Sequence, residues 1–187
     1  MAKLPIYLAS KSPRRRFLLK QFGIKFKIIT PKISEKIRGN NPKLLAIKLA
    51  KLKVHSIEGR VKRGIIIGVD TIVVIDGNIL GKPRNKKDAR YMIQLLSGKE
   101  HKVISGLYIL RKPHNRVIKT SELTKVKFRK LSRYEIENYV GSREPYDKAG
   151  AYGIQEKAGL FVERINGCYF NVVGLPIVKL LKCIRRL

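Results

Sequence analysis

The sequence predicts a mixed α/β fold in which helices pack against one twisted sheet. Apolar segments typical of strands alternate along the 187 residues with segments whose apolar residues recur at helical spacing. One segment, residues 64–69, is apolar without interruption, which is typical of a strand buried on both faces. The length fits one domain, or a single α/β unit with two lobes, and we expect one domain over residues 1–187.

The first part of the chain predicts two strands, each followed by a helix. These elements are a strand at 5–9, a helix at 12–22, a strand at 24–30 and a long helix from 42 to about 57. Ser12 and Pro13 suit the cap and the first residue of a helix, and Gly23 suits the position after its end. Asn41 and Pro42 open the long helix in the same way.

The rest of the chain predicts four strands and three helices. They are a strand from 64 to 74, a helix between Asn85 and Gly98, paired strands at 101–110 and 116–128, a helix ending near 141, a strand at 160–165 and a terminal helix at 175–184. Residues 76–78 predict a hairpin turn after the first of these strands. Ser132 and Glu135 match a capping box, which marks a helix start.

The net charge is strongly positive, at +29 from 42 Lys and Arg against 13 Asp and Glu. Such a charge suits nucleic acid, acidic surfaces or phosphorylated substrates. The basic residues are spread over the whole chain and form no tail or stripe, so we interpret many of them as solvated surface. We therefore expect no specific nucleic-acid partner.

Several classes of protein are disfavoured. No apolar run approaches the ~18 residues of a membrane span, and no signal peptide opens the chain. Cys168 and Cys183 have no metal-binding spacing, which favours reduced thiols, and the three histidines are scattered, which does not favour a zinc site. We expect a cytoplasmic protein with no membrane partner.

The strongest functional signal is the segment 8–16, which reads LASKSPRRR. A strand runs directly into a helix start, where unpaired backbone N–H groups carry a partial positive charge. Ser10 and Ser12 add hydroxyl groups, and Arg14 and Arg15 add forked cationic donors. This combination predicts a site for a polyanion, most simply a phosphate chain. The alternative is a capped surface helix with solvated arginines.

Two further segments place a charged side chain beside apolar or stiff backbone. Asp70 follows a buried strand, where a carboxylate is costly unless it binds a cation, joins a hydrogen-bond network or acts as a base. Its alternative role is to accept bonds from backbone N–H groups at a turn. Gly81 permits close approach and Pro83 stiffens the chain, which would aim Lys82. The alternative is an ordinary surface lysine.

Residues 144–155, EPYDKAGAYGIQ, predict a tight glycine-containing loop that approaches a ligand. Gln155 offers both a donor and an acceptor, which matches the edge of a pyrimidine base. The alternative is a structural turn that carries a lysine–aspartate pair on its surface.

Taken together, these motifs resemble the Maf family of nucleoside triphosphate pyrophosphatases. The matching segments, in order, are LASKSPRR, GVDTIVV, LGKP, LLSGKEH, EPYDKAGAYGIQ and NVVGLP, and they span nearly the whole chain. The resemblance implies a mixed sheet in two lobes around a central cleft, related to inosine triphosphate pyrophosphatases. The implied reaction is hydrolysis between the α and β phosphates, which gives the monophosphate and pyrophosphate and keeps the nucleotide pool clean.

Within the family, AYGIQ resembles the branch that acts on dTTP and UTP. By motif position, Asp70 corresponds to the proton acceptor. The residues at specificity positions are Arg14, Thr71 and Gln155. The residues at phosphate-binding positions are Ser10, Arg15, Lys53 and Lys82.

The resemblance also implies a divalent cation, Mg²⁺ or Mn²⁺, held by Glu35 or Asp70. Ser34 stands before Glu35 where the family often has Asp, which weakens the assignment of Glu35. Asp70 could serve as base or as metal ligand, and both roles stay open here. Phosphoryl transfer depends mainly on positioning and charge neutralisation, which the predicted cations would supply.

The competing hypothesis is a basic nucleic-acid-binding or septum-formation regulatory protein without turnover. It explains the charge of +29 directly, but it does not explain Asp70, Lys82 and the loop 144–155 together. We favour the enzyme, with a nucleoside triphosphate as the partner and a homodimer as a candidate assembly.

Overall fold

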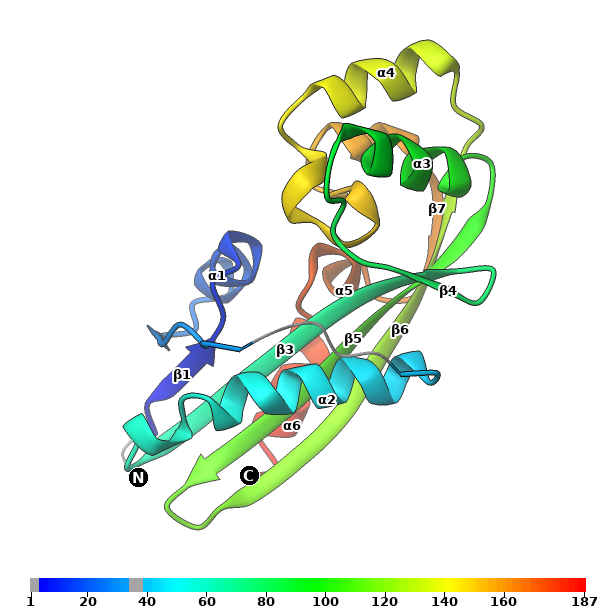
Figure 1. The fold of residues 1–187 in the computed structure, drawn as a ribbon. Helices are drawn as coiled ribbons and strands as arrows, with labels where there is room; N and C mark the ends of the chain where they lie inside the picture. Colours follow the sequence, from blue (N-terminus) through cyan, green and yellow to red (C-terminus); the bar gives the residue numbers. More distant parts are fainter. Residues whose placement is uncertain (1–3, 34–38) are drawn as a thin grey trace. The chain divides into compact units, whose positions relative to one another are not determined.

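The structure is a computed structural model that describes residues 4–33 and 39–187 (Figure 1). Its strands form one seven-stranded sheet in the order β2-β1-β3-β5-β6-β7, and β4 pairs with β3. Parallel and antiparallel pairs both occur, and helices alternate with the strands along the chain. The predicted mixed α/β class is therefore confirmed.

The chain divides into two compact units. The first unit comprises Met1–Asp70, Ser105–Glu122 and Gly174–Leu187, and the second comprises Thr71–Ile104 and Leu123–Val173. The chain passes from one unit to the other within β3 (Gly64–Ile75), β5 (Glu100–Lys112) and β6 (Arg116–Phe128). Each unit is described separately below.

In the first unit, β1 (Ile6–Ala9) pairs in parallel with β2 (Lys27–Ile28) and with β3. The helices of this unit are α1 (Pro13–Gln21), α2 (Pro42–His55), the short η1 (Glu58–Arg60) and α6 (Ile177–Ile184). Ala9 faces Gly68 in the register of β1 and β3. Ser10 follows Ala9 directly, and Asp70 follows Gly68 by two residues. Both residues therefore lie at the same end of the pairing between β1 and β3.

The predicted strand at 24–30 is wrong in length, because only Lys27 and Ile28 pair with β1. The backbone N–H of Ile24 donates to the carbonyl of Leu19, so this residue completes the end of α1. Both strand residues are exposed, and Ile28 is 43% exposed. Ile24 therefore belongs to the C-terminal end of α1 and not to the sheet.

The second unit contains β4 (Asn78–Leu80), β7 (Val162–Asn166) and several helices. These helices are α3 (Lys86–Leu96), α4 (Arg133–Gly141), α5 (Tyr169–Val173) and the short η2 (Pro145–Asp147), η3 (Ala149–Ala151) and η4 (Lys157–Phe161). Its core is mostly apolar and includes Val73, Ile93, Leu96, Phe128, Val140 and Phe161.

Several local predictions for this unit are confirmed. Asp76 and Gly77 have φ values of 47° and 77°, the left-handed geometry of a two-residue hairpin turn between β3 and β4. Ser132 and Glu135 form the predicted capping box, and the Asn85 side chain caps α3. Other boundaries differ: η4 delays β7 to Val162, α5 was not predicted, and α6 begins at Ile177 because Pro176 precedes it.

No helix in the described part of the chain is long and apolar enough to cross a membrane.

Candidate active site

The start of α1 has the predicted geometry of a capped helix with no acidic residue in its first turn. The Ser12 side chain accepts a hydrogen bond from the backbone N–H of Arg15 at 3.5 Å, and Pro13 occupies the first turn. The backbone N–H of Ser12 donates to Oγ of Ser10 at 3.1 Å. Both serine hydroxyls therefore take part in ordering the turn that leads from β1 into the helix.

Arg15 is buried, although the sequence predicted it as a donor to phosphate. Its Nε donates to the carbonyl of Gly174 at 2.9 Å, and its Nη1 donates to Oγ of Ser10 at 3.2 Å. The side chain is 9% exposed. Arg15 thus links the end of β1 to the segment before α6, and it fixes Ser10 while adding positive charge behind it. Arg14, one residue earlier, is half-buried.

The most distinctive feature of the first unit is the ion pair between Lys53 on α2 and Asp70 on β3. The Nζ of Lys53 lies 2.5 Å from Oδ1 of Asp70, and the two side chains are only 7% and 11% exposed. A buried carboxylate is costly unless it is paired, so Lys53 makes the charged form of Asp70 tolerable in this position. This network is one of the roles that the sequence analysis allowed for Asp70.

Two glycines allow α2 to lie close enough for this pair to form. A Cβ atom at Gly68 would lie 2.2 Å from the carbonyl oxygen of Ala50. At Gly106 on β5, a Cβ atom would lie 2.2 Å from the carbonyl carbon of Ala46. Any side chain at either position would force α2 away from the sheet, and Lys53 would move with it.

In the second unit, the segments of Lys82 and Gln155 are joined through their backbones. The N–H of Gly150 donates to the carbonyl of Gly81 at 2.9 Å. Lys82 and Gln155 are both exposed. A Cβ atom at Gly81 would meet no described atom within 4 Å, so no contact within the described residues requires glycine at this position. Its carbonyl oxygen, and not its missing side chain, connects it to the loop.

The loop 144–155 has the predicted tight backbone. Gly150 and Ala151 have φ values of 69° and 62°, both in the left-handed region that a non-glycine residue rarely adopts. A Cβ at Gly153 would lie 2.7 Å from Cε of Lys148, so the loop closes directly over the stem of this lysine.

Lys148 is buried inside the loop, whereas the sequence suggested only a surface pair with Asp147. The residue is 5% exposed. Its Nζ lies 2.7 Å from Oδ1 of Asp147, 2.9 Å from Oε2 of Glu156 and 2.5 Å from the carbonyl oxygen of Glu144. The flanking glycines were the available signal, since they permit backbone to wrap closely around a buried side chain.

The predicted site residues are thus divided between the units. The first unit holds Ser10, Arg14, Arg15, Lys53 and Asp70, and the second holds Thr71, Lys82 and Gln155. Asp70 and Thr71 are consecutive residues of β3, so the division falls between them. Glu35, the other predicted metal ligand, lies outside the described residues.

No group of three His, Cys, Asp or Glu side chains in residues 4–33 and 39–187 could hold a metal ion. Mg²⁺ commonly binds through one or two carboxylates together with substrate phosphates, so Asp70 suits a cation that arrives with a triphosphate.

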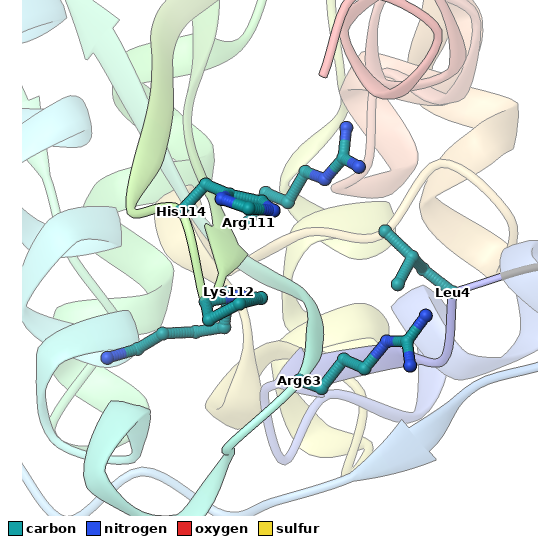
Figure 2. A pocket seen from close by; sticks show the side chains of 6 residues that line it. Leu4, Arg63, Arg111, Lys112 and His114 are labelled. Carbon is teal, nitrogen blue, oxygen red and sulfur yellow. The ribbon is translucent and has the colours of Figure 1, made fainter.

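A separate cavity of about 220 Å³ lies in the first unit, lined by Leu4, Arg63, Arg111, Lys112, Pro113 and His114 (Figure 2). Leu4 and Arg63 precede β1 and β3, so the cavity lies where these strands begin. Ser10 follows the other end of β1, and Asp70 lies farther along β3. The lining includes none of the predicted site residues, and we assign the cavity no part in the reaction.

Comparison with known sequences shows the family of this chain. The sequence matches the family described as Maf-like protein over residues 5–187. The chain belongs to the Maf family. The resemblance inferred from the motifs is therefore confirmed over almost the whole chain.

Relatives of this Maf chain carry a common name. It is 48% identical over 182 residues to the dTTP/UTP pyrophosphatase of Carboxydothermus hydrogenoformans, a match that covers 97% of this chain and 98% of the relative. It is 46% identical to the protein of that name from Dictyoglomus thermophilum, with 99% and 97% covered. The protein of that name from Thermosipho africanus is 52% identical, with 94% and 90% covered.

Proposed function

We propose that this chain hydrolyses dTTP and UTP to the nucleoside monophosphate and pyrophosphate. The observation that carries the proposal is the buried pair of Lys53 and Asp70, placed at the same edge of the β1–β3 pair as the capped start of α1. A carboxylate at the same end of these strands as a polyanion site suits the activation of water next to a phosphate chain. The relatives named dTTP/UTP pyrophosphatase supply the substrate class.

The triphosphate binds through cations and N–H donors. In the first unit these are the start of α1, Arg14 and the Ser10 hydroxyl, which the buried Arg15 holds in place. In the second unit, exposed Lys82 adds an ammonium group. Each of these groups favours negative charge both before and during reaction, so each contributes to substrate binding as well as to turnover.

Asp70 acts on the attacking water. The water oxygen attacks the α-phosphorus, the bond from this phosphorus to the bridging oxygen breaks, and pyrophosphate leaves with the electron pair. Asp70 orients the water and accepts its proton, while Lys53 keeps the carboxylate in place at 2.5 Å. A divalent cation, Mg²⁺ or Mn²⁺, would neutralise phosphate charge when bound, and Glu35 or Asp70 is the side chain proposed to hold it.

The base is selected by Gln155, with Thr71 and Arg14 as further specificity residues. The glutamine amide can donate to a uracil or thymine carbonyl and accept from the ring N–H. Cytosine reverses part of that pattern. An incorrect base would leave polar groups unpaired, at about 1–3 kcal/mol each.

The test is pyrophosphate release from dTTP, UTP, CTP, ATP and GTP at equal concentration with one metal. We expect dTTP and UTP to be hydrolysed well and the other nucleotides poorly. No turnover of any nucleotide, together with nucleic-acid binding that survives physiological salt, would instead support the binding protein that the net charge of +29 suggested.

We further propose a cytoplasmic location, where nucleotide pools are found, and a homodimer as the assembly to test by sedimentation.

A further inference from the structure

His101, at the start of β5, is an aromatic polar residue in the core of the second unit. It is 1% exposed, and its Nε2 lies 2.7 Å from the hydroxyl oxygen of Tyr152. The His101 ring meets the rings of Phe128 and Tyr152 edge to face, at centroid distances of 5.0 and 5.3 Å. Phe128 and Tyr152 also meet each other, at 4.9 Å. The hydrogen bond is therefore enclosed by aromatic surfaces.

This pair is neutral and incompletely satisfied. Burial lowers the pKa of His101 to about 4 and raises the pKa of the Tyr152 hydroxyl. The Nδ1 of His101 has no partner in the described part of the chain. If the tyrosine donates to Nε2, the N–H on Nδ1 is unpaired. If Nε2 donates instead, the tyrosine hydroxyl proton has no acceptor among residues 4–33 and 39–187. An unpaired buried donor costs about 1–3 kcal/mol, so an apolar pair of similar shape would serve the core at least as well.

The backbone beside Tyr152 is strained and tightly held. Ala151 has a φ of 62°, a conformation that a non-glycine residue adopts only where its surroundings enforce it. Its carbonyl accepts a hydrogen bond from the Tyr139 hydroxyl at 3.1 Å. The N–H of Gly150 donates to the carbonyl of Gly81, the residue before Lys82. Tyr152 is thus attached to the one loop that carries Gln155 and is joined to the Lys82 segment.

We infer that His101 is a positioning residue for base selection, acting through the Tyr152 hydroxyl on the loop that ends in Gln155. The hydrogen bond to His101 fixes Tyr152, the strained turn at Ala151 holds the residue before it, and Gln155 follows Tyr152 by three residues. A glutamine on a rigid loop can discriminate between base edges, whereas one on a loose loop cannot. This inference rests on the proposed function for its consequence and on the second unit alone for its geometry.

The experiment compares the full-length wild type with Tyr152→Phe, His101→Leu, the double variant and His101→Gln. We expect Tyr152→Phe to lower kcat/KM for dTTP about tenfold, with little change for CTP, so that the ratio between the two nucleotides narrows. The double variant should have a melting temperature near that of the wild type, because it leaves neither partner unpaired. Its ratio of kcat/KM for dTTP to that for CTP should nevertheless stay as low as in Tyr152→Phe. His101→Gln retains a hydrogen-bonding nitrogen and should recover part of the ratio.

Tyr134→Phe is the matched control, because it removes a hydroxyl from a tyrosine that is 74% exposed on α4 of the same unit. It should leave the ratio unchanged. A double variant with the wild-type dTTP to CTP ratio would overturn the inference.

Hydrogen exchange of the amides in residues 147–157 provides a readout that does not need turnover. We expect faster exchange there in Tyr152→Phe and in the double variant, with no change in α4. If exchange is unchanged, His101 does not hold the loop, whatever the enzyme hydrolyses. If exchange is faster but the wild type hydrolyses neither dTTP nor UTP, the positioning stands and the proposed function fails.

Discussion

Lys53 on α2 and Asp70 on β3 bring opposite charges to 2.5 Å across two elements of the first unit. Seventeen residues separate them in the sequence, and both side chains are nearly removed from solvent. We propose that the pair serves both stability and chemistry. The predictions below separate the two contributions.

Asp70→Asn should lower turnover of dTTP by about 10²–10⁴-fold, the usual contribution of a general base. It should also lower the free energy of unfolding, by up to about 3–5 kcal/mol, because the buried ammonium group of Lys53 loses the carboxylate that lies 2.5 Å away. Adding Lys53→Met should restore much of the stability and none of the activity. Asp76→Asn, at a side chain that is 58% exposed, is the control. Full activity in Asp70→Asn would remove this residue from the mechanism.

Arg15→Lys should reduce both melting temperature and kcat/KM. Lysine cannot reproduce the two directions in which Arg15 donates, to Gly174 and to Ser10. Loss of one such buried bond costs about 1–3 kcal/mol. Arg16→Lys is a suitable comparison, since Arg16 donates to the nearby carbonyls of Ser12 and Lys11 within the same turn. Equal melting curves for Arg15→Lys and the wild type would show that the link to Gly174 is dispensable.

Lys82→Ala should lower kcat/KM for dTTP without lowering stability. Lys82 is exposed, and a charge-assisted bond to phosphate is worth about 1.5–3 kcal/mol, or roughly 10–100-fold in rate. Lys87→Ala, at an exposed lysine on α3, should leave kcat/KM unchanged. Steady-state kinetics measure kcat/KM, and thermal melts measure the stability of both variants. The assignment of Lys82 to the phosphate site fails if both variants behave alike.

Gln155→Ala should lower the rate of dTTP hydrolysis, so that the rates for dTTP and CTP become more similar. The side chain is exposed, so melting temperature should not change. Lys157→Ala, two residues later and also exposed, tests whether any change in this segment has the same effect. Pyrophosphate release from each nucleotide is the measurement. An unchanged preference in Gln155→Ala would contradict the assignment to the dTTP and UTP branch while leaving the pyrophosphatase standing.

Stability should fall as the pH drops below 6.5, because of His101. Its ordinary pKa is 6.5, and burial lowers the pKa in the folded chain to about 4. Between these values the unfolded chain binds a proton that the folded chain does not, so the free energy of unfolding falls with pH. Above pH 6.5, His101 is neutral in both states and stability does not depend on its protonation. Toward pH 4, the free energy of unfolding falls by about 3 kcal/mol, since one pKa unit corresponds to ~1.4 kcal/mol.

Urea unfolding of the wild type and of His101→Gln at pH 7 and pH 5 measures this loss. The variant should lose less stability over the interval than the wild type. His114→Gln, on the exposed turn after β5, should follow the wild type. Identical losses in all three proteins would exclude His101 as the source.

Most of the fold was predictable where one local signal decides the backbone. Caps at Ser12, Asn41, Asn85 and Ser132 mark helix starts because each side chain bonds to N–H groups within three residues. The turn at Asp76 and Gly77 is likewise local. The predicted strand at 24–30 was too long. Its apolar residues suited a strand, but Ile24 bonds to Leu19 at the end of α1.

The sequence by itself determined the mixed α/β class, the family and the segments that hold the candidate site, because these depend on residue type and short spacing. Only the tertiary structure decided what the charged side chains do. Arg15 reaches Gly174, Lys53 pairs with Asp70, and Lys148 is buried inside its own loop. Burial and long-range partners depend on how distant segments pack, and close approach at Gly68 and Gly106 is what allows α2 to bring Lys53 to the carboxylate.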